Sequence, residues 1–147
     1  MAKMPRPVND AYFIDTWAWL VLANDRDPAF AQVAAIRSEP ASGAWITTDY
    51  VLDETFTRLF AAAPFSKARR FCEAIQEAAE TGSLVIERIT EKRFRAAWQL
   101  RLRYRDKPRI SFTDLSSFVV MSEMGITAAI TGDAHFEHAG LGFRRLP

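Results

Sequence analysis

The sequence is poor in the residues that mark several classes of protein. It has one cysteine, Cys72, so no disulfide can form within the chain and a disulfide-stapled fold is excluded. Six glycines and seven prolines are too few for a collagen-like or low-complexity chain. No apolar run approaches the roughly 18 residues that a membrane-spanning helix needs. We therefore expect a protein without a membrane segment that resides in the reducing cytoplasm.

A large excess of either charge is also absent, because 19 basic residues stand against 18 acidic ones. The charges are nevertheless uneven, since residues 88–109 hold nine Lys or Arg and two acidic residues, a net charge of +7. Such a segment can face a polyanion, or it can be a solvated helix face. Met1 to Asp10 lacks the apolar stretch of a secretory signal, so we expect no export.

The balance of 49% hydrophobic and 25% charged residues is typical of a globular protein, and we expect residues 1–147 to form a single domain. Short apolar runs predict strands at 12–14, 44–47, 84–86, 127–130 and 143–146. Apolar spacing and helix-ending residues predict helices at 17–22, 28–37, 48–63, 65–81, around 94–102 and at 112–124, with a turn at 39–43. This alternation favours a three-layer α/β/α sandwich around a central, mainly parallel sheet of four to five strands.

Four carboxylates fall where a parallel sheet gathers its functional residues. In right-handed β-α-β units the end of each strand and the start of the next helix lie at the same edge of the sheet. Asp15 closes the first strand and Asp133 follows the fourth, while Glu54 and Asp114 lie in the opening turns of helices. We therefore expect these four side chains to converge. Residues 104–110 must return the chain to that edge, and seven extended residues span at most ~23–25 Å, which leaves little slack.

Each carboxylate also has a structural explanation. Asp15 and Asp133 could cap helices or turns, Ser111 and Asp114 fit a capping box, and Glu54 suits the positive end of a helix dipole. Four acids at one edge, however, repel one another unless a cation or raised pKa values allow them to coexist. Oxygen ligands without clustered His or Cys suit Mg²⁺ or Mn²⁺. An acidic pocket near a basic segment is the arrangement expected for metal-assisted attack on a phosphodiester.

Four short motifs follow one another nearly from end to end of the chain: Phe13-Ile14-Asp15-Thr16, Thr47-Thr48-Asp49-Tyr50-Val51-Leu52-Asp53-Glu54-Thr55, Ser111-Phe112-Thr113-Asp114 and Ile130-Thr131-Gly132-Asp133-Ala134-His135-Phe136. In their order and spacing these motifs resemble those of the PIN-domain ribonucleases, and among them the small VapC-type toxins of bacterial toxin–antitoxin pairs. The resemblance implies a Mg²⁺-dependent endoribonuclease, with Mn²⁺ as a substitute, that acts on structured RNA. It also implies a small antitoxin protein as partner and a homodimer.

The resemblance further implies that Asp15, Glu54, Asp114 and Asp133 form the catalytic metal site. We expect Asp15 and Asp114 to hold the main ion, with Glu54 and Asp133 completing the site or holding a second one. Glu54 is our preferred proton acceptor.

Residues outside the four carboxylates are expected to bind RNA or to have no catalytic role. Arg101, Arg103 and Arg105 are candidates for gripping RNA phosphates, although their spacing splays them around a helix. His135 and His138 are expected at the surface, and Cys72 is expected to be a buried, inert thiol.

Two other functions fit parts of the sequence. A phosphatase of the haloacid dehalogenase type needs a second aspartate two residues after Asp15, where this chain has Trp17. A non-enzymatic protein-binding module, whose acids are helix caps, predicts neither stabilisation by metal nor any change in RNA.

Overall fold

The computed structural model describes residues 11–38 and 43–147, and its centre is one five-stranded sheet. The strands are β1 (Tyr12–Ile14), β2 (Trp45–Thr48), β3 (Leu84–Glu87), β4 (Ala128–Ile130) and β5 (Arg144–Leu146). They lie in the order β3-β2-β1-β4-β5, and every neighbouring pair is parallel. The predicted sheet is confirmed, including its fifth strand.

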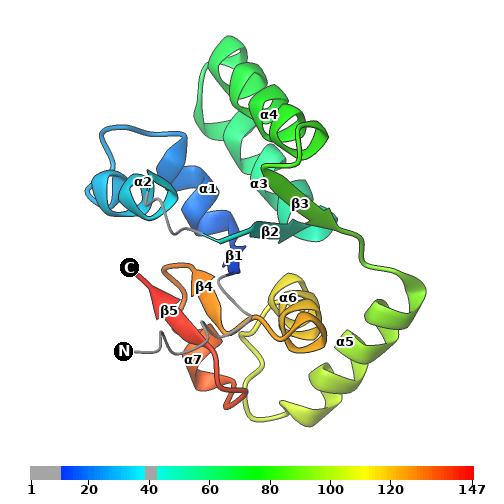
Figure 1. Ribbon diagram of the computed structural model, residues 1–147. Coiled ribbons are helices and arrows are strands. Elements are labelled where there is room, and N and C mark those ends of the chain that lie inside the picture. Colours follow the sequence, from blue (N-terminus) through cyan, green and yellow to red (C-terminus); the bar gives the residue numbers. More distant parts are fainter. Residues whose placement is uncertain (1–10, 39–42) are drawn as a thin grey trace, which may run out of the picture.

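Helices cover both faces of this sheet. They are α1 (Thr16–Leu22), α2 (Phe30–Ser38), α3 (Asp49–Ala62), α4 (Phe65–Glu80), α5 (Glu91–Arg103), α6 (Phe112–Met124) and α7 (His135–His138). Figure 1 shows α1, α2 and α4 on one side of the sheet and α5 and α6 on the other. The predicted three-layer α/β/α architecture is therefore confirmed. Within the described ranges, no helix combines the length and apolarity that crossing a membrane requires.

The helix boundaries follow the predicted signals with one exception. Gly82 and Gly125 take positive φ angles of 83° and 68° where α4 and α6 end, as expected for C-terminal glycines. The helix predicted to begin at Pro28 instead begins at Phe30, because Asp27 Oδ1 accepts the amide of Ala29 at 2.8 Å and keeps Pro28 in the preceding turn. Met1 to Asp10 and most of the predicted turn at 39–43 lie outside the described residues.

The burial of α6 places one of the predicted site residues, Asp114, inside the protein. α6 lies between the sheet and α5 (Figure 1), and its side chains Leu115, Phe118, Val120 and Met121 have no exposed surface. The helix is therefore buried on most of its circumference, and its two buried serines donate their hydroxyls to a backbone carbonyl of the same helix. Asp114 lies in the first turn of α6 and is only 7% exposed. Its carboxylate is therefore held in a largely buried position by the packing of the whole helix.

The connection between α5 and α6 is held by one arginine. The Arg101 guanidinium donates three hydrogen bonds to backbone carbonyls of the connection, at 2.9 Å to Tyr104, 2.7 Å to Lys107 and 2.6 Å to Ile110. Carbonyls outside regular structure need such partners when water has limited access. Arg101 thus fixes the path of residues 104–110, and this connection determines where α6 begins.

We expect Arg101→Met to destabilise the protein by about 2–3 kcal/mol, because the variant keeps the apolar stem but removes charge-assisted hydrogen bonds. Arg103 is exposed on the same helix and provides a matched control. Arg103→Met should change stability by less than about 0.5 kcal/mol. Urea unfolding of both variants measures the difference, and equal stabilities would contradict the role of Arg101.

Candidate active site

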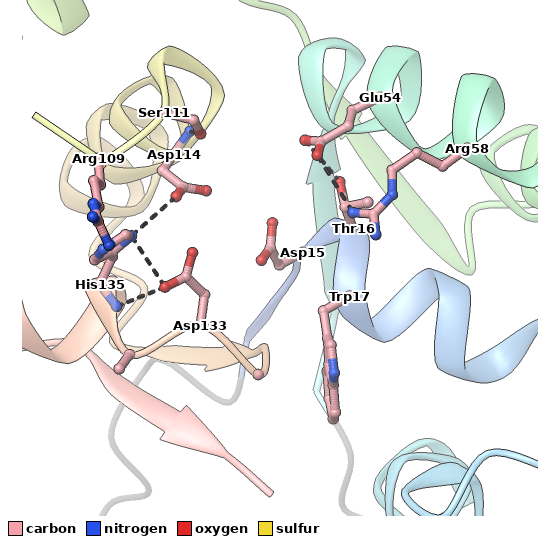
Figure 2. Close-up of a pocket in the computed structure, with 12 residues that line it drawn as sticks. Asp15, Thr16, Trp17, Glu54, Arg58, Arg109, Ser111, Asp114, Asp133 and His135 are labelled. Atoms are coloured by element: carbon pink, nitrogen blue, oxygen red, sulfur yellow. Dashed lines mark hydrogen bonds and ion pairs between the residues drawn. The ribbon is translucent and has the colours of Figure 1, made fainter.

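A cavity of about 480 Å³ opens at the edge of the sheet where β1 and β4 end (Figure 2). Its walls come from both helical layers, since α3 contributes from one side and α6 from the other. The residues that line it are Asp15, Thr16, Trp17, Glu54, Arg58, Arg109, Ser111, Asp114, Gly132, Asp133, Ala134 and His135. The cavity therefore lies at the sheet edge where open parallel sheets place their ligands.

All four predicted carboxylates line this cavity. Asp15 follows β1 and Asp133 follows β4, and these two strands are hydrogen-bonded neighbours. Glu54 comes from α3 and Asp114 from α6. Figure 2 shows Asp15 between two walls, with Asp114 and Asp133 on one and Glu54 on the other. The structure thus brings the four side chains together, while their role as metal ligands stays a prediction.

Asp15 is 6% exposed, and its Oδ2 accepts a hydrogen bond of 2.8 Å from the Thr131 hydroxyl. The pKa of Asp15 is raised to about 6, mainly by burial and to a smaller extent by the charges of Glu54 and Asp133. The hydrogen bond from Thr131 and the backbone of Thr16 act in the opposite direction. No cationic side chain is among the causes of this shift, so nothing with a positive charge in the described part of the chain offsets the cost of burying the Asp15 carboxylate.

Asp114 is shifted more strongly. Its pKa is raised to about 8, first by burial and then by the neighbouring charges of Asp15 and Asp133. At neutral pH this carboxyl group is therefore protonated, which removes its repulsion from the neighbouring carboxylates. A divalent cation would take over that role, and the hard carboxylate oxygens in the cavity match the ligands of Mg²⁺ and Mn²⁺. The residues present therefore fit a divalent cation.

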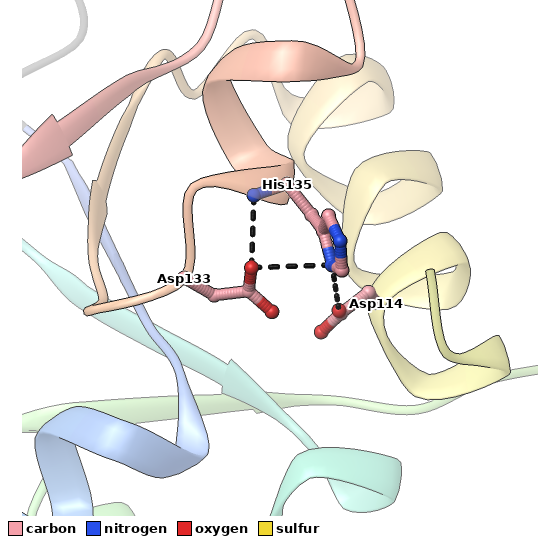
Figure 3. A group of neighbouring side chains, drawn as sticks. All are labelled: Asp114, Asp133 and His135. Atoms are coloured by element: carbon pink, nitrogen blue, oxygen red, sulfur yellow. Dashed lines mark hydrogen bonds and ion pairs between the residues drawn. The ribbon is translucent and has the colours of Figure 1, made fainter. Parts of the chain in front are cut away.

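His135, which the sequence placed at the surface, is half-buried beside two of the acids, while His138 is exposed. Its Nδ1 lies 3.2 Å from Asp133 Oδ1 and 3.9 Å from Asp114 Oδ2 (Figure 3). Asp114, Asp133 and His135 can each offer a ligand atom such that all three atoms lie within 4.8 Å of one another. The spacing Asp133-Ala134-His135 was the available signal, since it places an imidazole two residues after a carboxylate.

The helix-cap explanation holds for some of these residues and fails for Asp15. Asp15 is the N-cap residue of α1 but forms no side-chain cap hydrogen bond. Asp133 Oδ1 does accept the His135 amide at 2.8 Å, and Ser111 Oγ caps α6 by accepting the Asp114 amide at 3.0 Å. The buried Asp114 carboxyl group lies against Asp133 and His135 instead. Capping therefore explains the turn at Asp133 but not the burial of Asp15 and Asp114.

Glu54 is the most accessible of the four carboxylates, with 42% of its side chain exposed. The Thr16 hydroxyl donates to its Oε2 at 3.4 Å, and Arg58 lies one helical turn further on, 3.6 Å from Oε1. Glu54 is thus oriented toward the cavity while it keeps contact with solvent.

The arginines that line the cavity are Arg58 and Arg109, which the sequence did not single out. Arg101 is engaged with backbone carbonyls and does not line the cavity, and neither do Arg103 and Arg105, which are exposed beyond it. A role of these three in binding RNA stays a prediction. The Glu54-x-x-x-Arg58 spacing, one helical turn, was the signal for Arg58.

Thr131 links the Asp15 carboxylate to the backbone of Asp133, because its hydroxyl donates to Asp15 Oδ2 and accepts the Asp133 amide at 3.0 Å. We expect Thr131→Val to lower stability at pH 7 by roughly 1–3 kcal/mol, since the isosteric side chain leaves both groups unpaired. Thr131→Ser, which keeps the hydroxyl, should lose less. Urea unfolding of the three proteins makes the comparison. A loss in the serine variant equal to that in the valine variant would assign the effect to packing alone.

Comparisons with known proteins identify the family of this chain. The family model of the PIN domain matches residues 12–141. The 23S rRNA-specific endonuclease VapC20 of Mycobacterium tuberculosis is 32% identical over 134 residues, which cover 87% of this chain and 93% of that protein. The identity therefore spans nearly the whole of both chains.

Solved structures show the same fold. The crystal structure of Mycobacterium tuberculosis VapC20, described as a sarcin–ricin loop cleaving toxin, covers 88% of this chain and 95% of that one, with a TM-score of 0.74 and 27% identity. The Rickettsia felis VapBC2 structure, bound to a DNA fragment from its promoter, matches over 93% of this chain and 99% of that one, with a TM-score of 0.69 and 12% identity. At 12% identity the latter likeness shows the fold alone. Taken with the family match, these findings show that the chain belongs to the PIN-domain family and is of the VapC type.

Proposed function

We propose that this chain is a Mg²⁺- or Mn²⁺-dependent endoribonuclease and the toxin of a toxin–antitoxin pair. The observation that carries the proposal is the convergence of four carboxylates in one cavity of a PIN-domain chain, two of them buried with strongly raised pKa values. A protein that used these acids only as helix caps would have no reason to bury Asp15 and Asp114 side by side.

The residues of the cavity divide the work of hydrolysing a phosphodiester. Asp15, Asp114 and Asp133 would hold the cation, with Glu54 completing the set. When bound, the cation supplies charge neutralisation at the phosphoryl oxygens and makes bound water more acidic. Glu54 is accessible to solvent and accepts the proton that the attacking water gives up. Arg58 and Arg109 stand at the cavity wall, where guanidinium groups bind the flanking phosphates.

The substrate class and partner follow from the relatives. VapC20 is a 23S rRNA-specific endonuclease. Other solved structures of this fold are VapBC complexes, in which a toxin is bound to its antitoxin. We accordingly assign structured RNA as the substrate and a small antitoxin protein as the partner, in the cytoplasm. A homodimer is part of the same proposal.

Cleavage of a pool of structured RNAs by highly purified protein tests the function. Wild type, Asp15→Asn and Asp53→Asn are each incubated with Mg²⁺, Mn²⁺ or a chelator. Asp53 is an exposed acid next to Glu54 that lies outside the cavity, which makes it a matched control. Metal-dependent cleavage by wild type and Asp53→Asn, lost in Asp15→Asn, is the expected result. Cleavage that persists in Asp15→Asn would refute the proposed site.

A further inference from the structure

The side chain of His135 carries a buried polar atom, Nδ1, that forms no hydrogen bond within the described part of the protein. Nδ1 is buried although only two-thirds of the side chain is covered. The nearby Asp133 Oδ1 is already the acceptor of the His135 backbone amide at 2.8 Å. At 3.2 Å, Nδ1 is close to that oxygen without meeting the geometry of a hydrogen bond. Among the described residues, such an atom needs an explanation.

The position of His135 is held firmly by the residues around it. Asp133 forms the turn that starts α7, because its side chain accepts the His135 amide and its carbonyl accepts the Phe136 amide at 3.4 Å. Phe136 is fully buried, with its ring 4.9 Å from Phe118 of α6 in an edge-on contact. The imidazole is consequently fixed beside the first turn of α6, where Asp114 lies (Figure 3).

The distances around Nδ1 are those of ligands that share one ion. Two ligands bound at ~2.1 Å lie roughly 3 Å apart in adjacent octahedral positions and roughly 4.2 Å apart across the ion. Nδ1 lies 3.2 Å from Asp133 Oδ1 and 3.9 Å from Asp114 Oδ2, within this range. An unpaired nitrogen and two carboxylates at such spacing form a mixed nitrogen–oxygen donor set.

We infer that His135 Nδ1 is a ligand of the cation held by Asp114 and Asp133, and that this nitrogen makes the site prefer Mn²⁺ to Mg²⁺. The inference rests on the cation site of the proposed function and adds a ligand to the four carboxylates. Imidazole is a good ligand for first-row transition ions, whereas Mg²⁺ favours oxygen donors. Loss of the nitrogen therefore weakens Mn²⁺ binding more than Mg²⁺ binding.

Metal binding to the metal-free protein tests this without any reference to activity. The chain has two histidines, so His138→Ala is a natural control for His135→Ala. Calorimetric titration with MnCl2 should show affinity lowered at least about tenfold in His135→Ala, while MgCl2 affinity changes less and His138→Ala matches wild type. Electron spin-echo envelope modulation of the Mn²⁺-loaded wild type should show coupling to a directly bound nitrogen.

The outcomes separate this inference from the proposed function. If wild type binds neither Mn²⁺ nor Mg²⁺, both the inference and the cation site fail. If Mn²⁺ binds equally to wild type and His135→Ala and no nitrogen coupling is seen, the His135 inference alone is overturned and the carboxylate site stands. Should His135→Ala fail to fold, wild type labelled with ¹⁵N-histidine decides, because a bound imidazole changes the modulation frequency on labelling and an unbound one leaves none.

Discussion

Replacing Asp114 with asparagine should make the metal-free protein more stable while it removes the nuclease activity. Folding raises the pKa of Asp114 to about 8, from an ordinary value of 3.8. A carboxyl group with a raised pKa costs stability above its unfolded pKa. The cost therefore begins near pH 4, increases up to about pH 8 and is constant above that. Asparagine has nearly the same shape and no charge, so the variant avoids this cost.

The expected size of the effect at pH 7 is substantial. One pKa unit corresponds to about 1.4 kcal/mol, so we expect Asp114→Asn to gain at least that much in free energy of unfolding. Cleavage should decrease by more than about 100-fold, which is the upper range for residues that only support a metal ligand.

Urea unfolding of wild type and Asp114→Asn in chelator, from pH 5 to pH 9, measures the stability difference, and the RNA assay measures the activity. Asp53→Asn, an exposed acid outside the cavity, should change neither. A variant less stable than wild type at pH 8 would show that Asp114 contributes to folding in a way that its burial among acids does not explain.

Divalent cations should stabilise the protein in a strongly pH-dependent way. A cation and a proton compete for the same carboxylates, so binding releases the protons that Asp15 and Asp114 hold. With pKa values of about 6 and about 8, Asp114 carries its proton below pH 8 and Asp15 joins it below pH 6. The apparent affinity should rise roughly tenfold per pH unit between pH 6 and pH 8, more steeply below pH 6, and level off above pH 8.

Thermal unfolding at a fixed concentration of Mn²⁺ or Mg²⁺ makes this visible. A ligand at 100 times its Kd adds about 2.7 kcal/mol of stability. The increase in Tm should be small at pH 5.5 and large at pH 8.5 for wild type. In Asp114→Asn the pH dependence between pH 6 and pH 8 should disappear along with most of the affinity. An increase in Tm that does not vary with pH would place the cation away from these two carboxylates.

The fold was largely predictable because its signals are local. Buried parallel strands are continuous apolar runs, and Gly82 and Gly125 end their helices through backbone conformations that other residues avoid. The order of the strands was not predictable, since it depends on where the long connection from β3 to β4 crosses the sheet. No local signal encodes that crossing.

The site was predictable in part for the same reason. Asp15 and Asp133 follow strands whose ends meet at one edge, so topology alone brings them together. His135 and Arg109 depend on the path of loops that apolar spacing does not describe. The partners of Arg101 also depend on such a loop, because its guanidinium reaches three carbonyls that take their places only when the 104–110 connection has folded.

The central position of β1 has a consequence for how the enzyme is made. β1 is among the first segments to be synthesised in the described part of the chain, yet it hydrogen-bonds on one side to β4. The hydrogen bond between Thr131 and Asp15 joins residues 116 positions apart. A chain translated only as far as residue 126 therefore lacks β4, which leaves one edge of β1 unpaired, and it also lacks Asp133. An unfinished copy of the chain therefore cannot assemble the acidic cavity, which forms only once the segment that carries β4 and Asp133 has been made.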